Sequence, residues 1–428
     1  MLLQSTKNKP IIFFLLTMAA YFFLLLISPL TVNVERSPVA ILIFFTSLLI
    51  IPPSIILGSR IISYLPKKQV NKKSVLIRSY GDRVSFAVIS LNFWGGIGLL
   101  FVSIDRFIIR GMPLGLELFS ARDILETTDT SSFGLIGQIL SALTIFSAGY
   151  LLIERRVKSV SYFKILITYS LAIVYLLLSI MLGSRSGLLN FILIVVFMIL
   201  FDRYVNDPKY KMPFILFAKI FFLGITFILS MATIFLWRLG EMEVDVSMSI
   251  FNSGYAYTVT PSENILDLTS SGIFGDLFLA IISLIQYAIH GFYEFQLLVE
   301  NFNGDHTYGQ QLLWFPLKVY NVLGGSFSIT DLNYVRGVRN GIFSSFFGPI
   351  FIDFGIFTPL ATACIFFILS IPFGLMSTKK IWTISYASLI CCLIICLPVW
   401  NSIMSAAWIY PFISVFMIPF LTLRFKLK

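Results

Sequence analysis

Residues 38–58 read PVAILIFFTSLLIIPPSIILG and contain no charged side chain. An α-helix needs roughly 20 consecutive apolar residues to cross a hydrocarbon core of about 30 Å, so this stretch is long enough to span a membrane. The whole chain of 428 residues has the same character, because 57% of its residues are hydrophobic and only 12% are charged. Soluble domains carry about 25% charged residues, so soluble, disordered, fibrous and disulfide-rich classes fit poorly. The composition predicts a polytopic membrane protein.

Ten predominantly apolar runs of this kind predict an all-α protein with about ten transmembrane helices. Strands are not expected to cross the membrane, because the runs are apolar throughout and do not alternate. The runs lie at 11–30, 38–58, 84–104, 133–153, 165–182, 187–201, 213–236, 349–375, 381–400 and 404–422.

The distribution of charge predicts the orientation of these helices. With the N-terminus in the cytoplasm, the cytoplasmic segments hold most of the 31 Lys and Arg residues and few of the 21 acids. This arrangement satisfies the positive-inside rule, and both termini are expected in the cytoplasm. The net charge of +10 is then a consequence of topology, and no nucleic-acid partner is expected.

The basic residues on the predicted outer side are nearly all arginines. A guanidinium is a rigid fork that binds phosphate or carboxylate through two hydrogen bonds, so this preference indicates an anionic ligand outside the membrane. Pairing with acids of the outer loops is the alternative explanation. The residues are Arg36, Arg106, Arg110, Arg122, Arg185, Arg238, Arg336 and Arg339, with Lys318 as the single lysine.

The longest predicted outer segment divides the chain into three parts. Helices one to seven occupy 1–236, a large extracytoplasmic loop of over a hundred residues occupies 237–348, and helices eight to ten occupy 349–428. A structured loop of this length usually carries function. Its apolar run at 277–293 either spans, which gives eleven helices, or forms a re-entrant or interfacial helix near 277–295. Spanning would place the basic C-terminal residues outside, so the expected number remains ten.

A polar stripe marks that run. Gln286, His290 and Glu294 are spaced at i, i+4 and i+8, along one face of a helix. An ionisable group at membrane depth costs roughly 2.5–3.5 kcal/mol, which suggests a function; a solvated stripe at the water interface is the alternative. His290 is a candidate general base because histidine titrates near neutral pH, and Glu294 would fix its tautomer or act as the base itself.

The turn GSRSG at 183–187 joins the fifth and sixth expected helices. Its glycines permit close approach of a ligand, and its amides and Arg185 suit an anion; an arginine that caps a helix hairpin is the alternative. Asp353, at the outer edge of the eighth span, is expected to form an ion pair with Arg185, Arg336 or Arg339.

The order of these features resembles a known family. After the GSR turn comes the long loop with YAIHGFYEF at 287–295 and GQQLLWFPLKVYNVLG at 309–324, and then FSSFFGPIFIDFG at 343–355, which opens the next span. This order is similar to that of Wzy-type O-antigen polymerases, within the oligosaccharide repeat-unit polymerase family. The resemblance implies a GT-C-like architecture related to the O-antigen ligases and a location in the bacterial inner (cytoplasmic) membrane. It also implies an undecaprenyl-pyrophosphate-linked oligosaccharide as substrate, and a chain-length regulator protein is a candidate partner.

A glycan on a polyprenyl pyrophosphate has an activated anomeric carbon, so its transfer needs no nucleotide, metal or other cofactor. The enzyme must hold the leaving group and deprotonate the acceptor hydroxyl, and we expect direct displacement with inversion. The expected base is His290 or Glu294; the expected pyrophosphate or glycan clamps are Arg185, Arg238, Arg336 and Arg339, with Lys318 as a further anion contact.

Two other functions fit part of the sequence. An O-antigen ligase uses the same donor but transfers glycan to a lipid A-core, and the segments at 287–295 and 343–355 favour the polymerase. A polysaccharide flippase or transporter would carry charged residues deep in several spans, whereas the polar groups here gather outside the spans.

Overall fold

The computed structural model describes most of the chain. The described residues are 9–64, 80–112, 131–180, 185–207, 213–241, 245–262, 265, 272–322, 324–327, 338–339, 344–378, 381–399 and 401–422.

Helices make up almost all of the regular structure in these ranges. The α-helices are α1 (Lys9–Ile27), α2 (Pro38–Tyr64), α3 (Tyr80–Ser103), α5 (Ser132–Ser141), α6 (Leu143–Val157), α7 (Tyr162–Ile180), α8 (Arg185–Asn206), α9 (Phe214–Glu241), α10 (Val246–Phe251), α12 (Gly272–Asn301), α13 (Trp314–Val322), α14 (Phe347–Phe354), α15 (Thr358–Ser370), α16 (Ile381–Cys396) and α17 (Ala406–Leu421). A π-helical segment, η3 (Ile104–Ile109), extends α3, and 3-10 segments lie at η4 (Gly254–Tyr257), η5 (Gly355–Phe357), η6 (Ile371–Thr378) and η7 (Ser402–Met404). The strands are β1 (Leu30–Val32) and β2 (Val259–Pro261).

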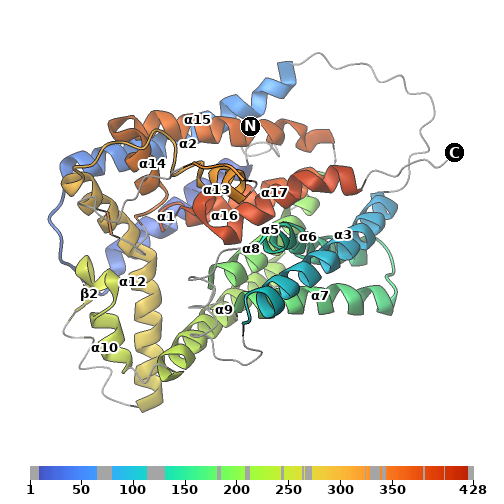
Figure 1. The fold of residues 1–428 in the computed structure, drawn as a ribbon, viewed down its shortest axis with the longest axis horizontal. Helices are drawn as coiled ribbons and strands as arrows, with labels where there is room; N and C mark the ends of the chain where they lie inside the picture. Colours follow the sequence, from blue (N-terminus) through green and yellow to red (C-terminus); the bar gives the residue numbers. More distant parts are fainter. Residues whose placement is uncertain are drawn as a thin grey trace.

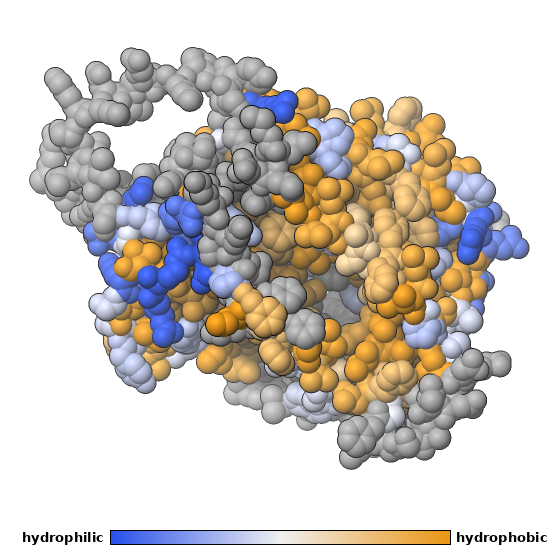
Figure 2. Space-filling view, turned by 180° about the vertical axis from the view of Figure 1, so that it is seen from behind, coloured by the Kyte–Doolittle hydropathy of each residue, from blue (hydrophilic) through white to orange (hydrophobic). Residues whose placement is uncertain are grey.

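The prediction of an all-α polytopic membrane protein is confirmed. The described residues contain seven helices that are long and apolar enough to cross a membrane, and four shorter apolar helices. These correspond one to one to the ten expected runs and α12. The surface follows the same plan, because a broad apolar region lies between polar ends (Figure 2).

Two expected boundaries differ in the structure. The run at 349–375 is not one straight helix, because Gly355 has a φ of +55° and separates α14 from α15. Glycine adopts this left-handed conformation without the penalty of a Cβ. The short strands were not expected either: β1 and β2 pair antiparallel, with Leu30 opposite Pro261, and join the connection after α1 to the segment before α12.

The core of the bundle centres on α16. This helix is apolar on all sides, as expected of a helix enclosed by others, and nearly all of its residues are buried. It packs against α1, α8 and α17. Its few polar groups have partners in neighbouring helices: the hydroxyls of Tyr150 on α6 and Ser385 on α16 are 2.6 Å apart.

One end of the bundle carries α12, and the chain leaves α17 toward the opposite end (Figure 1). We call these the α12 end and the Asp202 end. At the Asp202 end, two buried carboxylates join helix termini: Asp202 of α8 pairs with Arg156 of α6, and Glu154 of α6 lies 3.0 Å from the amine of Lys164 on α7. Burial of both acids therefore depends on cations from neighbouring segments.

Close contact between α3 and α5 sets the position of the C-terminal end of α3. A Cβ at Gly98 would lie 2.2 Å from the backbone nitrogen of Ser141, and one at Gly137 would lie 2.7 Å from that of Val102. Small residues allow two helix backbones to approach in this way within a membrane. The π-helical segment that follows is thereby held against α5.

Gly98→Ala should lower the thermal stability of the purified protein, because the added methyl group overlaps backbone atoms of α5. Overpacking of this kind costs about 1–3 kcal/mol, which corresponds to several degrees in the melting temperature in detergent. Gly96→Ala is the matched control, since its nearest neighbour would be a side-chain carbon of Leu171 at 3.7 Å. Equal melting temperatures for the two variants would contradict this account of the α3–α5 contact.

Candidate functional site

Helix α12 lies across one end of the bundle. It runs crosswise to α2 and α15 (Figure 1) and packs against α2, α9, α14 and β2. Gly291 makes the closest approach, because a Cβ at this position would lie 2.6 Å from the carbonyl oxygen of Val399 and 2.8 Å from that of Pro398. The middle of α12 therefore rests directly on the connection between α16 and α17.

The polar stripe of α12 faces protein. Gln286 and His290 are fully buried and Glu294 is 3% exposed, so the alternative of a solvated stripe is wrong. The stripe packs under the short strand β2: the Gln286 amide donates to the carbonyl of Val259 at 2.7 Å, and the Thr258 hydroxyl donates to Glu294 at 3.1 Å. The ribbon of β1 and β2 thus covers one side of the stripe.

Glu294 forms an ion pair with Arg339. The Arg339 Nη1 donates to Glu294 Oε1 at 2.6 Å, while Nη2 donates to the carbonyl of Gly254 at 2.5 Å. The guanidinium also lies over the ring of Tyr257, 4.6 Å from its centroid. The side chain of Arg339 is 27% exposed, so the cation lies where the buried stripe meets the surface. The hydrogen bonds from Thr258 and Arg339 are both accepted by Oε1 of the carboxylate.

His290 has a defined tautomer. Its Nδ1 lies 2.7 Å from the carbonyl oxygen of Tyr287, and because a carbonyl oxygen only accepts, Nδ1 carries the proton. The other ring nitrogen, Nε2, then carries the lone pair that a general base needs. The imidazole packs against two aromatic rings that also contact each other, with its centroid 4.3 Å from that of Tyr255 and 5.4 Å from that of Tyr287. These rings fix its orientation.

Of the expected clamps, the structure brings Arg339 to the stripe. Lys318 lies on α13 and is half-buried, and no contact of Lys318 with the stripe is observed among the described residues. Arg185 is the first residue of α8 and Arg238 belongs to the last turn of α9, but both side chains lie outside the described part of the structure. Arg336 lies outside the described residues altogether.

Asp353 stabilises the turn at residues 307–312 by hydrogen bonds. Its carboxylate accepts hydrogen bonds from the Thr307 hydroxyl at 2.5 Å and from the backbone N–H groups of Gln311 and Leu312 at 3.0 Å each. The expected ion pair with Arg339 is therefore not formed, because Arg339 is bound to Glu294. The Asp353 turn presents Tyr308, which is 84% exposed, at a φ of +48°.

A second group of charged residues at this end includes Arg106 and Arg110, which were expected among the outer arginines but not among the clamps. Asp105, Arg106 and Arg110 belong to the end of α3 and are all buried. Asp105 pairs with Arg110, with 3.1 Å between Oδ2 and Nε, and also accepts hydrogen bonds from Ser131. The available signal was a set of three ionisable residues, SIDRFIIR, at the end of an apolar run.

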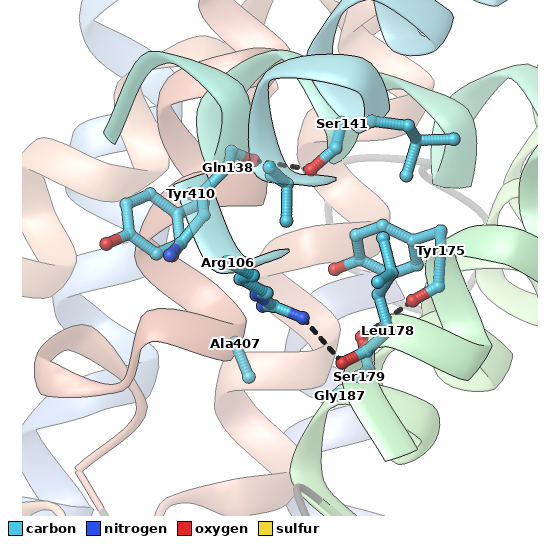
Figure 3. Close-up of a pocket in the computed structure, with 11 residues that line it drawn as sticks. Arg106, Gln138, Ser141, Tyr175, Leu178, Ser179, Gly187, Ala407 and Tyr410 are labelled. Carbon is cyan, nitrogen blue, oxygen red and sulfur yellow. Dashed lines mark hydrogen bonds between the residues drawn. The ribbon is translucent and has the colours of Figure 1, made fainter. Parts of the chain in front are cut away.

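Arg106 lines a cavity of about 80 Å³. Figure 3 shows its guanidinium among residues of α3, α5, α7 and α17, with a hydrogen bond of 2.7 Å to the carbonyl of Leu178. The π-helical geometry of η3 places this side chain inward, and such π-bulges often occur at functional sites. The cavity also touches Gly187, in the first turn of α8 and the last residue of the GSRSG sequence.

Within the described ranges, no three His, Cys, Asp or Glu side chains gather as metal ligands. Comparisons with protein-family models, with curated proteins and with solved structures find no match for this chain. The functional argument therefore depends on the residues themselves.

Removing one partner of the Glu294–Arg339 pair should destabilise the protein, because the other charge is left beside a buried stripe. We expect Glu294→Gln and Arg339→Gln each to lower the free energy of unfolding. The double variant should lose less free energy of unfolding than the sum of the two single losses, and the difference, the coupling energy, should be about 0.5–3 kcal/mol. Chemical unfolding in detergent measures these terms, and Glu300→Gln on the exposed face of α12 is the control. Additive losses would show that the two side chains do not interact.

Proposed function

We propose that this protein is a membrane glycosyltransferase that joins oligosaccharide repeat units carried on undecaprenyl pyrophosphate. The observation that supports the proposal most is the buried stripe of α12, on which a histidine of fixed tautomer lies one helical turn from a carboxylate paired with an arginine. A proton acceptor and a phosphate-binding cation are the two groups that this chemistry requires.

The placement of α12 supports an interfacial helix in preference to an eleventh span. Helix α12 runs crosswise to α2 and α15 (Figure 1). We therefore propose that it lies along the membrane surface, at the depth of lipid headgroups. We propose that the α12 end is extracytoplasmic, as the positive-inside rule predicts. The stripe then meets a lipid-linked pyrophosphate at the level where its phosphates lie.

In the proposed reaction, the acceptor sugar hydroxyl loses its proton to His290 Nε2 or to Glu294. The oxygen attacks the anomeric carbon of the donor, the bond from that carbon to the pyrophosphate oxygen breaks, and polyprenyl pyrophosphate leaves. Arg339 stabilises the negative charge that develops on the leaving group. Its second contact, with the carbonyl of Gly254, fixes the plane of the guanidinium and so the direction in which the remaining N–H groups point.

An assay of chain extension, with purified protein and polyprenyl-pyrophosphate repeat units, tests which residue is the general base. His290→Ala or Glu294→Gln should lower the rate by about 10²–10⁴-fold, the usual contribution of a general base, and the larger loss identifies the base. Glu300→Gln, on the same helix, should extend chains at the normal rate. If the unaltered protein leaves the repeat units unextended, or transfers them only to a lipid A-core acceptor, the proposed function is wrong.

Arg185→Ala should also arrest polymerisation in bacterial cells, because the turn at 183–187 is proposed to hold the donor phosphates. The expected result is lipid A-core that carries single repeats, with normal amounts of the protein in the membrane. Electrophoresis of the cell's glycolipids measures chain length. Long chains in the variant would remove Arg185 from the proposed site.

The orientation is tested by cysteine labelling at Tyr308, which is 84% exposed on the Asp353 turn. In a Cys364→Ser background, Tyr308→Cys should react with a membrane-impermeant maleimide in intact spheroplasts. A cysteine placed at Arg83, which is exposed at the Asp202 end, should react only after the membrane is opened. The reverse pattern would place the α12 end in the cytoplasm.

A further inference from the structure

The buried arginine at the end of α3 has an unusual environment. Arg106 is 6% exposed, and its guanidinium lines the cavity shown in Figure 3. Among the described residues, its one hydrogen bond is from Nη1 to the carbonyl of Leu178. An arginine has five N–H donors, and the hydrogen bond to Leu178 uses one of them.

No acid of the cavity neutralises this cation. The neighbouring carboxylate, Asp105, is bound to Arg110 and Ser131. Among the described residues that line the cavity, none carries a carboxylate; the polar ones are Gln138, Ser141, Tyr175, Ser179 and Tyr410. A buried charge is unfavourable unless it is paired; Asp105 attracts Arg106, but its oxygens are bound to Arg110 and Ser131.

Helix ends of both signs line the cavity: the last turn of α7, with Leu178 and Ser179, is a negative end, and two N-termini are positive ends. Gly187 lies in the first turn of α8 and Ala407 in the first turn of α17, and both residues line the cavity. The N-terminus of each helix is the positive end of its dipole and attracts anions. Two helix N-termini and one buried guanidinium thus converge on one space.

We infer that the Arg106 cavity is a binding site for a phosphoryl group. Its volume of about 80 Å³ accommodates a group of this size, since a single water needs roughly 10–15 Å³ on the same measure. A phosphoryl group offers several oxygens, which suit both the forked guanidinium and the N–H groups of a helix terminus. The site lies where η3 and the start of α8 come together. This inference stands on burial and charge, and it does not require glycosyl transfer.

Two sources supply this chemistry at a membrane surface: a free phosphate ion and the phosphate monoester of a lipid. The test uses full-length protein purified in a neutral detergent. Melting temperature and native mass spectra are recorded with inorganic phosphate, with short-chain phosphatidic acid and with short-chain phosphatidylcholine, at constant ionic strength. Stabilisation by binding follows the ligand concentration relative to its dissociation constant.

Phosphate or phosphatidic acid should stabilise the unaltered protein, and Arg106→Gln should weaken binding of the same ligand at least tenfold. Arg106→Lys should bind with intermediate strength, because the charge remains but the fork is lost. Arg83→Gln is the matched control, with the same change of charge at an exposed site of the Asp202 end. Without ligand, Arg106→Gln should melt no lower than the unaltered protein, since it removes a buried positive charge that lies beside a second one, on Arg110.

Stabilisation by inorganic phosphate assigns the site to a free ion, and stabilisation by phosphatidic acid alone assigns it to a lipid phosphate. The inference is overturned if neither ligand stabilises the protein, if phosphatidylcholine acts equally well, or if Arg106→Gln and Arg83→Gln bind alike. Should Arg106→Gln fail to fold, Tyr175→Phe removes a lining hydroxyl and must also weaken binding. None of these results depends on chain extension, so the proposed glycosyl transfer and this site fail independently.

Discussion

Glu294 is enclosed by protein, and a carboxylate in such a position needs both a cation and hydrogen-bond donors around it. It obtains them from parts of the chain that are far apart in sequence. Arg339 supplies the cation, and Thr258, next to β2, supplies a hydroxyl. The same guanidinium binds the carbonyl of Gly254. One buried charge thus joins α12, the segment around η4 and β2, and residues 338–339, and the arrangement of the α12 end depends on it.

The sequence predicted the helices well because the requirement behind them is simple. Apolar runs of sufficient length have one stable form in lipid, so composition alone locates them. The break at Gly355 was missed, since a single glycine in an apolar run does not reveal its φ angle. The strands β1 and β2 were missed because three residues are too few to show alternation, and their pairing depends on the fold.

The candidate site was predictable only in part. The spacing of Gln286, His290 and Glu294 placed these side chains on one face of α12, but spacing does not say whether that face meets solvent or protein. Arg339 was one of several outer arginines in the sequence, and only the fold brings it to Glu294. Arg106 belonged to the same set. Its burial could not be predicted, because it depends on how α3, α5, α7, α8 and α17 pack around it.

The ribbon of β1 and β2 has a consequence for how the protein is made. Thr31 and Thr260, whose hydroxyls lie 2.9 Å apart, are separated by 229 positions. During co-translational insertion, β1 leaves the ribosome early and then remains without its partner until more than half of the chain has been synthesised. Contacts of such long range form late, so most of the membrane helices enter the bilayer before this end of the molecule acquires its final shape.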